Sequence, residues 1–251
     1  LRRSGIFDKD ELRAAFNEKT KAIIITTPHN PTGKVFTREE LRFIADLCIE
    51  FDALALTDEI YEHINFIGGH QSFAQFDFIK DRVITINGVS KGFAMTGWRL
   101  GYIATNTTVA KACEKIQGQF TSGANAIAQR AGITALTTDL KPTYAMTEEF
   151  TRRRKRVLEL VREIPGLPCF EPEGAFYIFP NVTYYYGKSY GDLTIKNSAD
   201  FSMYLLHTAH VSSVMGDAFG DPDCVRFSFA NSLPNIEKAW ARIKDALALL
   251  Q

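Results

Sequence analysis

Several polar side chains of this sequence follow directly on apolar, β-rich runs. Asn30 comes after KAIIITTPH, Asp58 and Tyr61 close the run ALALTDEIY, and Ser90 and Lys91 follow RVITINGV. Each residue alone is more often structural or solvated than functional. In open α/β sheets, however, ligands bind outside the carboxyl ends of the strands. The sequence therefore predicts that these five side chains meet at one site.

The residue types at these strand ends suit one kind of ligand. A lysine amine held away from bulk water, here Lys91, forms a Schiff base with a carbonyl. An aspartate at the end of a buried strand, here Asp58, keeps a proton on a ring nitrogen by charge pairing. The Tyr61 hydroxyl and the Asn30 amide both hydrogen-bond a phenolate-type oxygen.

A phosphate is the remaining group that the segment VSKGFAMTGWRLGY is suited to bind. Ser90 offers a hydroxyl, and Arg99, eight positions after Lys91, offers a guanidinium that grips phosphate with two parallel bonds. Gly88 and Gly92 are expected to let a flat ligand approach the backbone. The ligand with an aldehyde, a pyridine nitrogen, a ring oxygen and a phosphate is pyridoxal 5'-phosphate.

The elements that position these residues predict an α/β fold. Thr37 and Glu40 form a capping box before the helical pattern LRFIADLCIEF, which separates two of the apolar strands. Continuous apolar strands separated by helices indicate a mostly parallel sheet with helices on both faces. After Pro165 and Gly166 the pattern changes to short strands and two helices, typical of a smaller α+β domain. We expect a large-domain part over residues 1–145 and a small domain over 146–251.

Composition excludes several classes of partner. With 29 basic and 29 acidic residues the formal net charge is zero, which gives no basic footprint for nucleic acid. The basic run at residues 152–156 is expected to be a solvated helix face. No apolar run reaches the 18 residues of a membrane helix, and no His or Cys grouping has the spacing of metal ligands. The four cysteines are expected to be free, buried thiols in a reducing cytoplasm.

Four motifs in this order, HNPTG, DEIY, SKGFAMTGWRLGY and VRFSFA, resemble those of the class I and II aminotransferases of fold type I, in particular the bacterial aspartate aminotransferase branch. The resemblance covers essentially the whole chain. Family members begin with a further N-terminal segment, so the chain looks incomplete at its start. The resemblance also implies a homodimer with active sites at the subunit interface.

The resemblance implies a role for each motif residue. Lys91 would form the Schiff base with the cofactor and then move the proton at the substrate Cα, with Asp58 and Tyr61 as its catalytic partners. Arg226, in VRFSFA, would bind the substrate α-carboxylate together with Asn30. The cofactor contacts would fall on Asn30, Asp58, Tyr61, Ser90, Lys91 and Arg99.

The implied function is transfer of an amino group between an amino acid, aspartate by inheritance, and a 2-oxo acid, 2-oxoglutarate. Three alternatives stay open: an aminotransferase for aromatic or other amino acids, an eliminating enzyme of the same fold type such as a β-lyase or an aminocyclopropane carboxylate synthase-like protein, and a degenerate cofactor-binding module serving regulation. A nucleotide-hydrolysing protein is a further reading, because ALALTDE resembles a Walker B strand. That reading needs a phosphate-binding G-x-x-x-x-G-K-[ST] loop, and these residues contain none.

Overall fold

A computed structural model describes residues 8–251 of the chain. These residues divide into two compact units. The sheet unit comprises Asp8–His29 and Lys34–Thr147, and the C-terminal unit comprises Asn30–Gly33 and Glu148–Gln251. The short loop from Asn30 to Gly33 thus packs with residues that follow it by more than a hundred positions.

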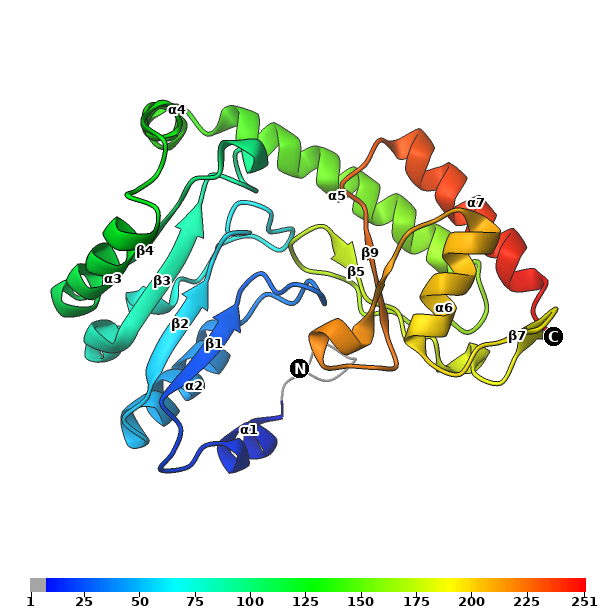
Figure 1. Ribbon diagram of the computed structural model, residues 1–251, viewed down its shortest axis with the longest axis horizontal. Helices are drawn as coiled ribbons and strands as arrows, with labels where there is room; N and C mark the ends of the chain where they lie inside the picture. The colour runs from blue at the N-terminus through cyan, green and yellow to red at the C-terminus, as the bar shows by residue number, and fades with distance from the viewer. Residues whose placement is uncertain (1–7) are drawn as a thin grey trace. The chain divides into compact units, whose positions relative to one another are not determined.

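The sheet unit is built on four strands that lie side by side in chain order (Figure 1). They are β1 (Ala22–Thr26), β2 (Leu54–Asp58), β3 (Val83–Gly88) and β4 (Gly101–Ala104). The first three pair in parallel, and β4 pairs antiparallel with β3. The register aligns Thr26 with Asp58 and Asp58 with Ile86, so the carboxyl ends of the parallel strands meet at one edge.

Helices and short 3₁₀ turns fill the connections of the sheet unit. The predicted capping box is confirmed: Thr37 accepts from the Glu40 N–H, and the Glu40 carboxylate accepts from the Thr37 N–H, at the start of α2 (Arg38–Glu50). α2 buries Leu41, Ile44 and Leu47 and packs on β2. The other helices and 3₁₀ turns are α1 (Lys9–Ala15), η1 (Phe73–Gln75), η2 (Asp77–Arg82), η3 (Thr96–Trp98), α3 (Thr107–Phe120), α4 (Ala126–Thr137) and the start of α5 (Lys141–Arg162).

The C-terminal unit has a small sheet and two further helices. Its strands run in the order β5–β9–β8, all antiparallel, and β6 and β7 form a separate hairpin. The elements are β5 (Tyr177–Ile178), η4 (Thr183–Tyr185), β6 (Ser189–Tyr190), β7 (Leu193–Thr194), α6 (Ser198–Tyr204), a π-helical turn η5 (Leu205–Ala209), β8 (Val214–Met215), η6 (Gly216–Phe219), β9 (Val225–Ser228) and α7 (Leu233–Ala248).

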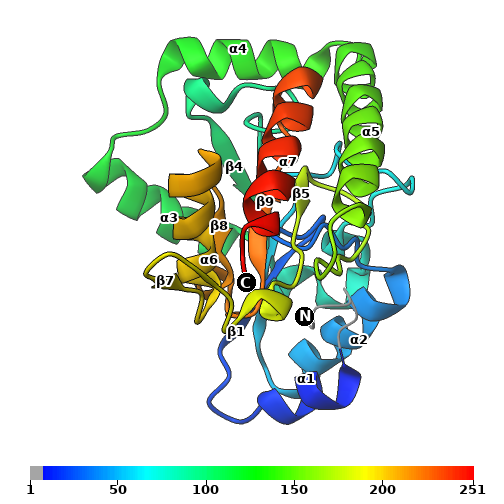
Figure 2. The same cartoon turned by 90° about the vertical axis from the view of Figure 1, so that its right-hand side faces the viewer.

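Ion pairs join the later part of α5 to α7, which run side by side (Figure 2). Arg156 reaches Glu237 at 2.7 Å, and Lys244 reaches Glu163 at 2.8 Å. Arg152 pairs with Glu149 along the same helix at 2.8 Å. The sequence predicted a solvated helix face for this basic run. The structure instead shows a salt-bridged face on which the Arg153 and Arg154 side chains are only 21% and 16% exposed.

The predicted fold class is confirmed: a mostly parallel α/β sheet accompanied by a smaller α+β unit. All four cysteines are free, and Cys48 and Cys224 are buried as expected. The expectation of burial was wrong for Cys113, which is exposed on α3, a helix with no buried residue. Among residues 8–251, no helix is both long and apolar enough to span a membrane.

Candidate active site

Asp58 is the last residue of β2, and its electrostatics suit a buried charge partner. Its carboxylate is half-buried and accepts one internal hydrogen bond, from the Ile60 N–H at 3.1 Å. Burial raises the pKa of Asp58, and the neighbouring Glu59 adds to the rise. The Ile60 hydrogen bond and the charge of Lys91 oppose it. An aspartate in such a position gains from a cationic partner, because charge pairing offsets the cost of burial.

Lys91 and Tyr61 lie close to each other in the sheet unit. The Lys91 Nζ atom is 5.8 Å from the centroid of the Tyr61 ring, within the range of a cation–π contact. Tyr61 is 3% exposed, and Lys91 is partly shielded from solvent. Lys91 is also close enough to Asp58 to lower its pKa. The structure therefore brings together three of the predicted residues that arrive on two neighbouring strand ends.

The loop that carries Lys91 is tightly wound. The Ala94 N–H donates to the Lys91 carbonyl at 3.2 Å, and the Met95 N–H donates to the Val89 carbonyl at 3.3 Å. Ala94 and Arg99 both adopt left-handed backbone conformations, with φ of 53° and 54°. Such conformations cost a non-glycine residue about 1–2 kcal/mol and cluster at functional sites.

Arg99 and Ser90, the predicted phosphate ligands, flank this loop. Ser90 is partly exposed at its start. Arg99 is exposed, donates to the Thr96 carbonyl at 3.1 Å, and lines a cavity of about 870 Å³ together with Trp98 and Gln117. Arg99 thus faces open space in the sheet unit, with guanidinium N–H groups left over for an anion.

The two glycines near Lys91 have a different role from the one expected. A Cβ at Gly88 would lie 2.8 Å from the Leu100 carbonyl oxygen, and one at Gly92 would lie 2.6 Å from the His63 ring. Both positions are filled by protein atoms. These glycines therefore serve close packing around the lysine loop, and the expected room for a flat ligand is not found at either position.

Asn30 and Arg226 meet within the C-terminal unit. The Arg226 Nη1 atom donates to the Asn30 Oδ1 atom at 2.8 Å, although 196 residues separate them. The contact depends on the turn after Asn30: Gly33 has φ of +76° and accepts from the N–H groups of Glu173 and Gly174, both at 2.8 Å. The sequence grouped these two residues as substrate ligands, and the structure places them in contact.

Aromatic rings hold the Arg226 guanidinium in place. Its central carbon lies 4.4 Å from the centroid of the Tyr177 ring and 4.7 Å from that of Phe219. Rings at these distances attract a cation and fix the plane of the guanidinium. One nitrogen is bonded to Asn30, and a guanidinium has further N–H groups of the kind that bind a carboxylate with two parallel bonds.

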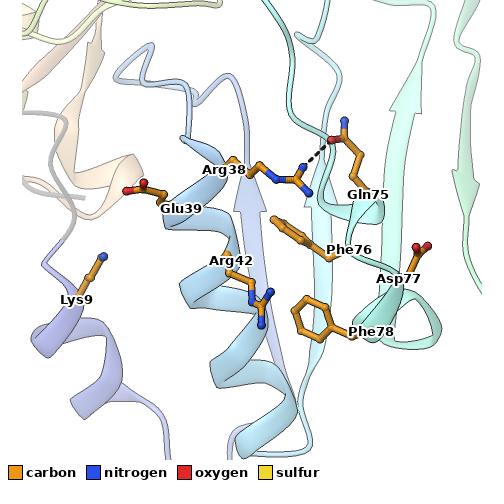
Figure 3. Close-up of a pocket in the computed structure, with 8 residues that line it drawn as sticks. All are labelled: Lys9, Arg38, Glu39, Arg42, Gln75, Phe76, Asp77 and Phe78. Carbon is orange, nitrogen blue, oxygen red and sulfur yellow. Dashed lines mark hydrogen bonds between the residues drawn. The ribbon is translucent and has the colours of Figure 1, made fainter.

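A further pocket of the sheet unit, of about 900 Å³, contains none of the predicted residues. It lies between α2 and the segment of η1 and η2 (Figure 3), and its lining residues are Lys9, Arg38, Glu39, Arg42, Gln75, Phe76, Asp77 and Phe78. Arg38 stacks over Phe76 at 4.9 Å and Arg42 over Phe78 at 4.3 Å. Arg42 also binds Asp46 through two hydrogen bonds of 2.9 and 3.1 Å. These contacts account for the arginines as packing residues.

Sequence reasoning missed the network around Glu59, a 2%-exposed carboxylate next to Asp58 that accepts from His70, Ser72 and Phe73. The acid pair in DEIY was visible in the sequence. A buried carboxylate calls for donors. The donors, however, lie in a loop more than ten residues away, and the sequence gives no signal that the loop folds back.

Comparisons with known proteins show that the chain is similar to aminotransferases. A bifunctional aspartate aminotransferase and glutamate/aspartate-prephenate aminotransferase of Petunia hybrida is 42% identical over 252 residues, covering 98% of this chain and 53% of the relative. The crystal structure of the aspartate aminotransferase from Rhizobium meliloti superposes with a TM-score of 0.92 at 36% identity, covering 98% of this chain and 62% of that one. The crystal structure of an aromatic aminotransferase from Pyrococcus horikoshii superposes with a TM-score of 0.89 at 38% identity, covering 97% of this chain and 64% of that one.

The chain therefore spans about half to two thirds of the length of these proteins. The family model "Aminotransferase class I and II" matches residues 4–243, which takes in all the strands and most of both units described above. The chain therefore belongs to the class I and II aminotransferase family.

Proposed function

We propose that this chain carries the cofactor-binding lysine and the substrate-binding arginine of a pyridoxal-phosphate-dependent aminotransferase. Members of the class I and II family depend on pyridoxal phosphate. The observation that carries the proposal is the grouping of Asp58, Tyr61 and Lys91 at the ends of β2 and β3. Amino acids and 2-oxo acids are the substrates.

The residues present fit the cofactor chemically. A half-buried carboxylate, a shielded amine and an exposed guanidinium beside a cavity match a ring nitrogen, an aldehyde and a phosphate in turn. Asp58 would hold the ring nitrogen, Lys91 the aldehyde, and Ser90 with Arg99 the phosphate. Tyr61 and Asn30 would donate to the ring oxygen. When bound, the cofactor takes up the amino group and withdraws electrons from the reacting carbon.

The chain's own side chains would do the remaining work. The Lys91 amine would take a proton from the substrate Cα and return it, as a positioned general base and acid. The negative charge of Asp58 would keep the ring nitrogen protonated. Arg226, fixed by Asn30 and two rings, would bind the substrate through its α-carboxylate and so limit its orientation.

For the substrate pair we propose aspartate and 2-oxoglutarate, because the Petunia and Rhizobium relatives are aspartate aminotransferases. The Pyrococcus aromatic aminotransferase supports an aromatic amino acid as the second candidate.

We also propose a homodimer. Exposed apolar side chains on α3 and α4 support it, among them Phe120 at 85% and Ile127 at 73% exposed. The free cysteines support a reducing cytoplasm.

The test is a half-reaction screen of the full-length protein. Each amino acid is added in turn without a 2-oxo acid, while the visible absorbance of the bound cofactor is followed and the product is analysed. Loss of absorbance with aspartate and release of its 2-oxo acid are expected. Release of ammonia and pyruvate would instead establish an eliminating enzyme, and absence of any visible absorbance would refute the proposal.

A further inference from the structure

Glu59 is a carboxylate that the proposed function leaves without a task. It directly follows Asp58 and is 2% exposed. A buried carboxylate is costly unless hydrogen-bonded donors compensate for the water it has lost. The donors that compensate Glu59 therefore hold the side chain directly next to Asp58.

Three donors from one short segment meet the Glu59 carboxylate. The His70 Nε2 atom lies 2.8 Å from Oε2, and the Ser72 hydroxyl and the Phe73 N–H lie 3.1 Å from Oε1. Phe73 is completely buried and begins η1, which anchors the segment in the core. Both oxygens of Glu59 are thus engaged.

His70 is directed at this carboxylate. Its side chain is 13% exposed, and its Nδ1 atom is buried without a hydrogen-bond partner among residues 8–251. Among residues 8–251, the His70 ring therefore forms its hydrogen bond with Glu59. A ring fixed in this way gives the carboxylate a single orientation.

The backbone around Asp58 is tied to both neighbouring strands. The Thr27 N–H donates to the Asp58 carbonyl at 3.0 Å, and the Glu59 N–H donates to the Ile86 carbonyl at 2.9 Å. The two acidic side chains are held in addition, Asp58 by the Ile60 N–H and Glu59 by the segment from His70 to Phe73. The charge of Glu59 also raises the pKa of Asp58, so the position at which the Glu59 carboxylate is held matters to Asp58.

We propose that His70 is a positioning residue for Asp58: through the Glu59 carboxylate, it fixes the turn that presents the Asp58 side chain to the ring nitrogen of the cofactor. The inference rests on the proposed function. It assigns to the segment from His70 to Phe73 a role in cofactor binding without any contact to the cofactor.

The test measures the dissociation constant of pyridoxal phosphate and its bound absorbance spectrum in five variants of the full-length protein. His70→Leu removes the donor and leaves Glu59 unpaired, so the dissociation constant is expected to rise about tenfold, the scale seen when the partners of metal ligands are removed. His70→Gln keeps a donor and should stay within about threefold of the wild type on the same scale. The exposed His207→Leu is the matched control and should change nothing.

The fourth and fifth variants, Glu59→Gln alone and Glu59→Gln with His70→Leu, decide whether His70 acts through Glu59. Without the charge the missing donor matters little, so affinity should return to that of Glu59→Gln alone. This comparison also holds if His70→Leu alone fails to fold. Equal dissociation constants in the wild type and His70→Leu, or no recovery in the double variant, would overturn the inference while leaving the proposed function intact. A wild type without bound cofactor would overturn both.

Discussion

Replacing Arg226 by lysine keeps the positive charge but removes the planar fork of the guanidinium. In the structure one nitrogen of Arg226 donates to Asn30 at 2.8 Å, and the central carbon of the group lies 4.4 and 4.7 Å from the ring centroids of Tyr177 and Phe219. A lysine ammonium retains the attraction to both rings and one hydrogen bond. It cannot at the same time bind Asn30 and grip a carboxylate with two parallel bonds.

The expected loss follows from those contacts. One charge-assisted hydrogen bond to the substrate is removed, which is worth about 1.5–3 kcal/mol. Because 1.36 kcal/mol corresponds to a factor of ten, kcat/KM should fall about 10- to 150-fold. The free energy of unfolding should fall by less than about 1.5 kcal/mol, since the cation–π contacts and one hydrogen bond are retained.

Steady-state kinetics with the amino acid found in the half-reaction screen, together with urea unfolding, separates the two effects. Arg153→Lys is the matched control, because Arg153 also lies over a ring, Phe150 at 5.6 Å, and pairs with Glu149 at 2.8 Å, but has no predicted contact with substrate. A change in kcat/KM of less than threefold in Arg226→Lys, or an equal loss in both variants, would refute the assignment of Arg226 as the carboxylate ligand.

Three further variants test the packing and the charges of the sheet unit. Because burial raises the pKa of Asp58, its charge destabilises the folded state above that pKa and not in acid, where the carboxyl is neutral. Asp58→Asn should therefore resist urea better than the wild type at pH 7 and no better at pH 3. The same variant should bind pyridoxal phosphate weakly. Burial lowers the pKa of His29 from 6.5 to about 4. Up to about 3 kcal/mol of folding stability present above pH 6.5 should therefore be lost as the pH falls to 4. In urea unfolding, His29→Gln should not show this pH-dependent loss. A Cβ at Gly92 would lie 2.6 Å from the His63 ring, whereas one at Gly97 meets nothing within 4 Å. Thermal unfolding should therefore show Gly92→Ala destabilised by about 1–3 kcal/mol and Gly97→Ala little changed.

The placement of Asp58 and Lys91 was predictable because it depends on short-range patterns. An apolar run that ends in charged residues predicts a buried strand and its carboxyl end, and parallel pairing brings such ends to one edge. The capping box at Thr37 and Glu40 is equally local and was confirmed. Local signals of this kind are sufficient for the sheet and for the order of its elements.

The surroundings of these residues depend on contacts between distant segments, which one sequence does not reveal. Gly92 was read as room for a ligand, yet the space is filled by His63 from the loop after β2. His70 gave no signal of its own, because its role comes from a loop that folds back on Glu59. The left-handed backbone at Arg99 likewise follows from the winding of the whole loop and not from the preference of an arginine.

The central claim is that Lys91 is the residue to which pyridoxal phosphate becomes attached. Borohydride reduction of the full-length protein, followed by proteolysis and mass spectrometry, locates the attached cofactor on a single peptide. We expect the reduced phosphopyridoxyl group on Lys91 in the wild type and its absence in Lys91→Ala. Attachment at another lysine in the wild type, or unchanged covalent labelling of Lys91→Ala, would contradict the account.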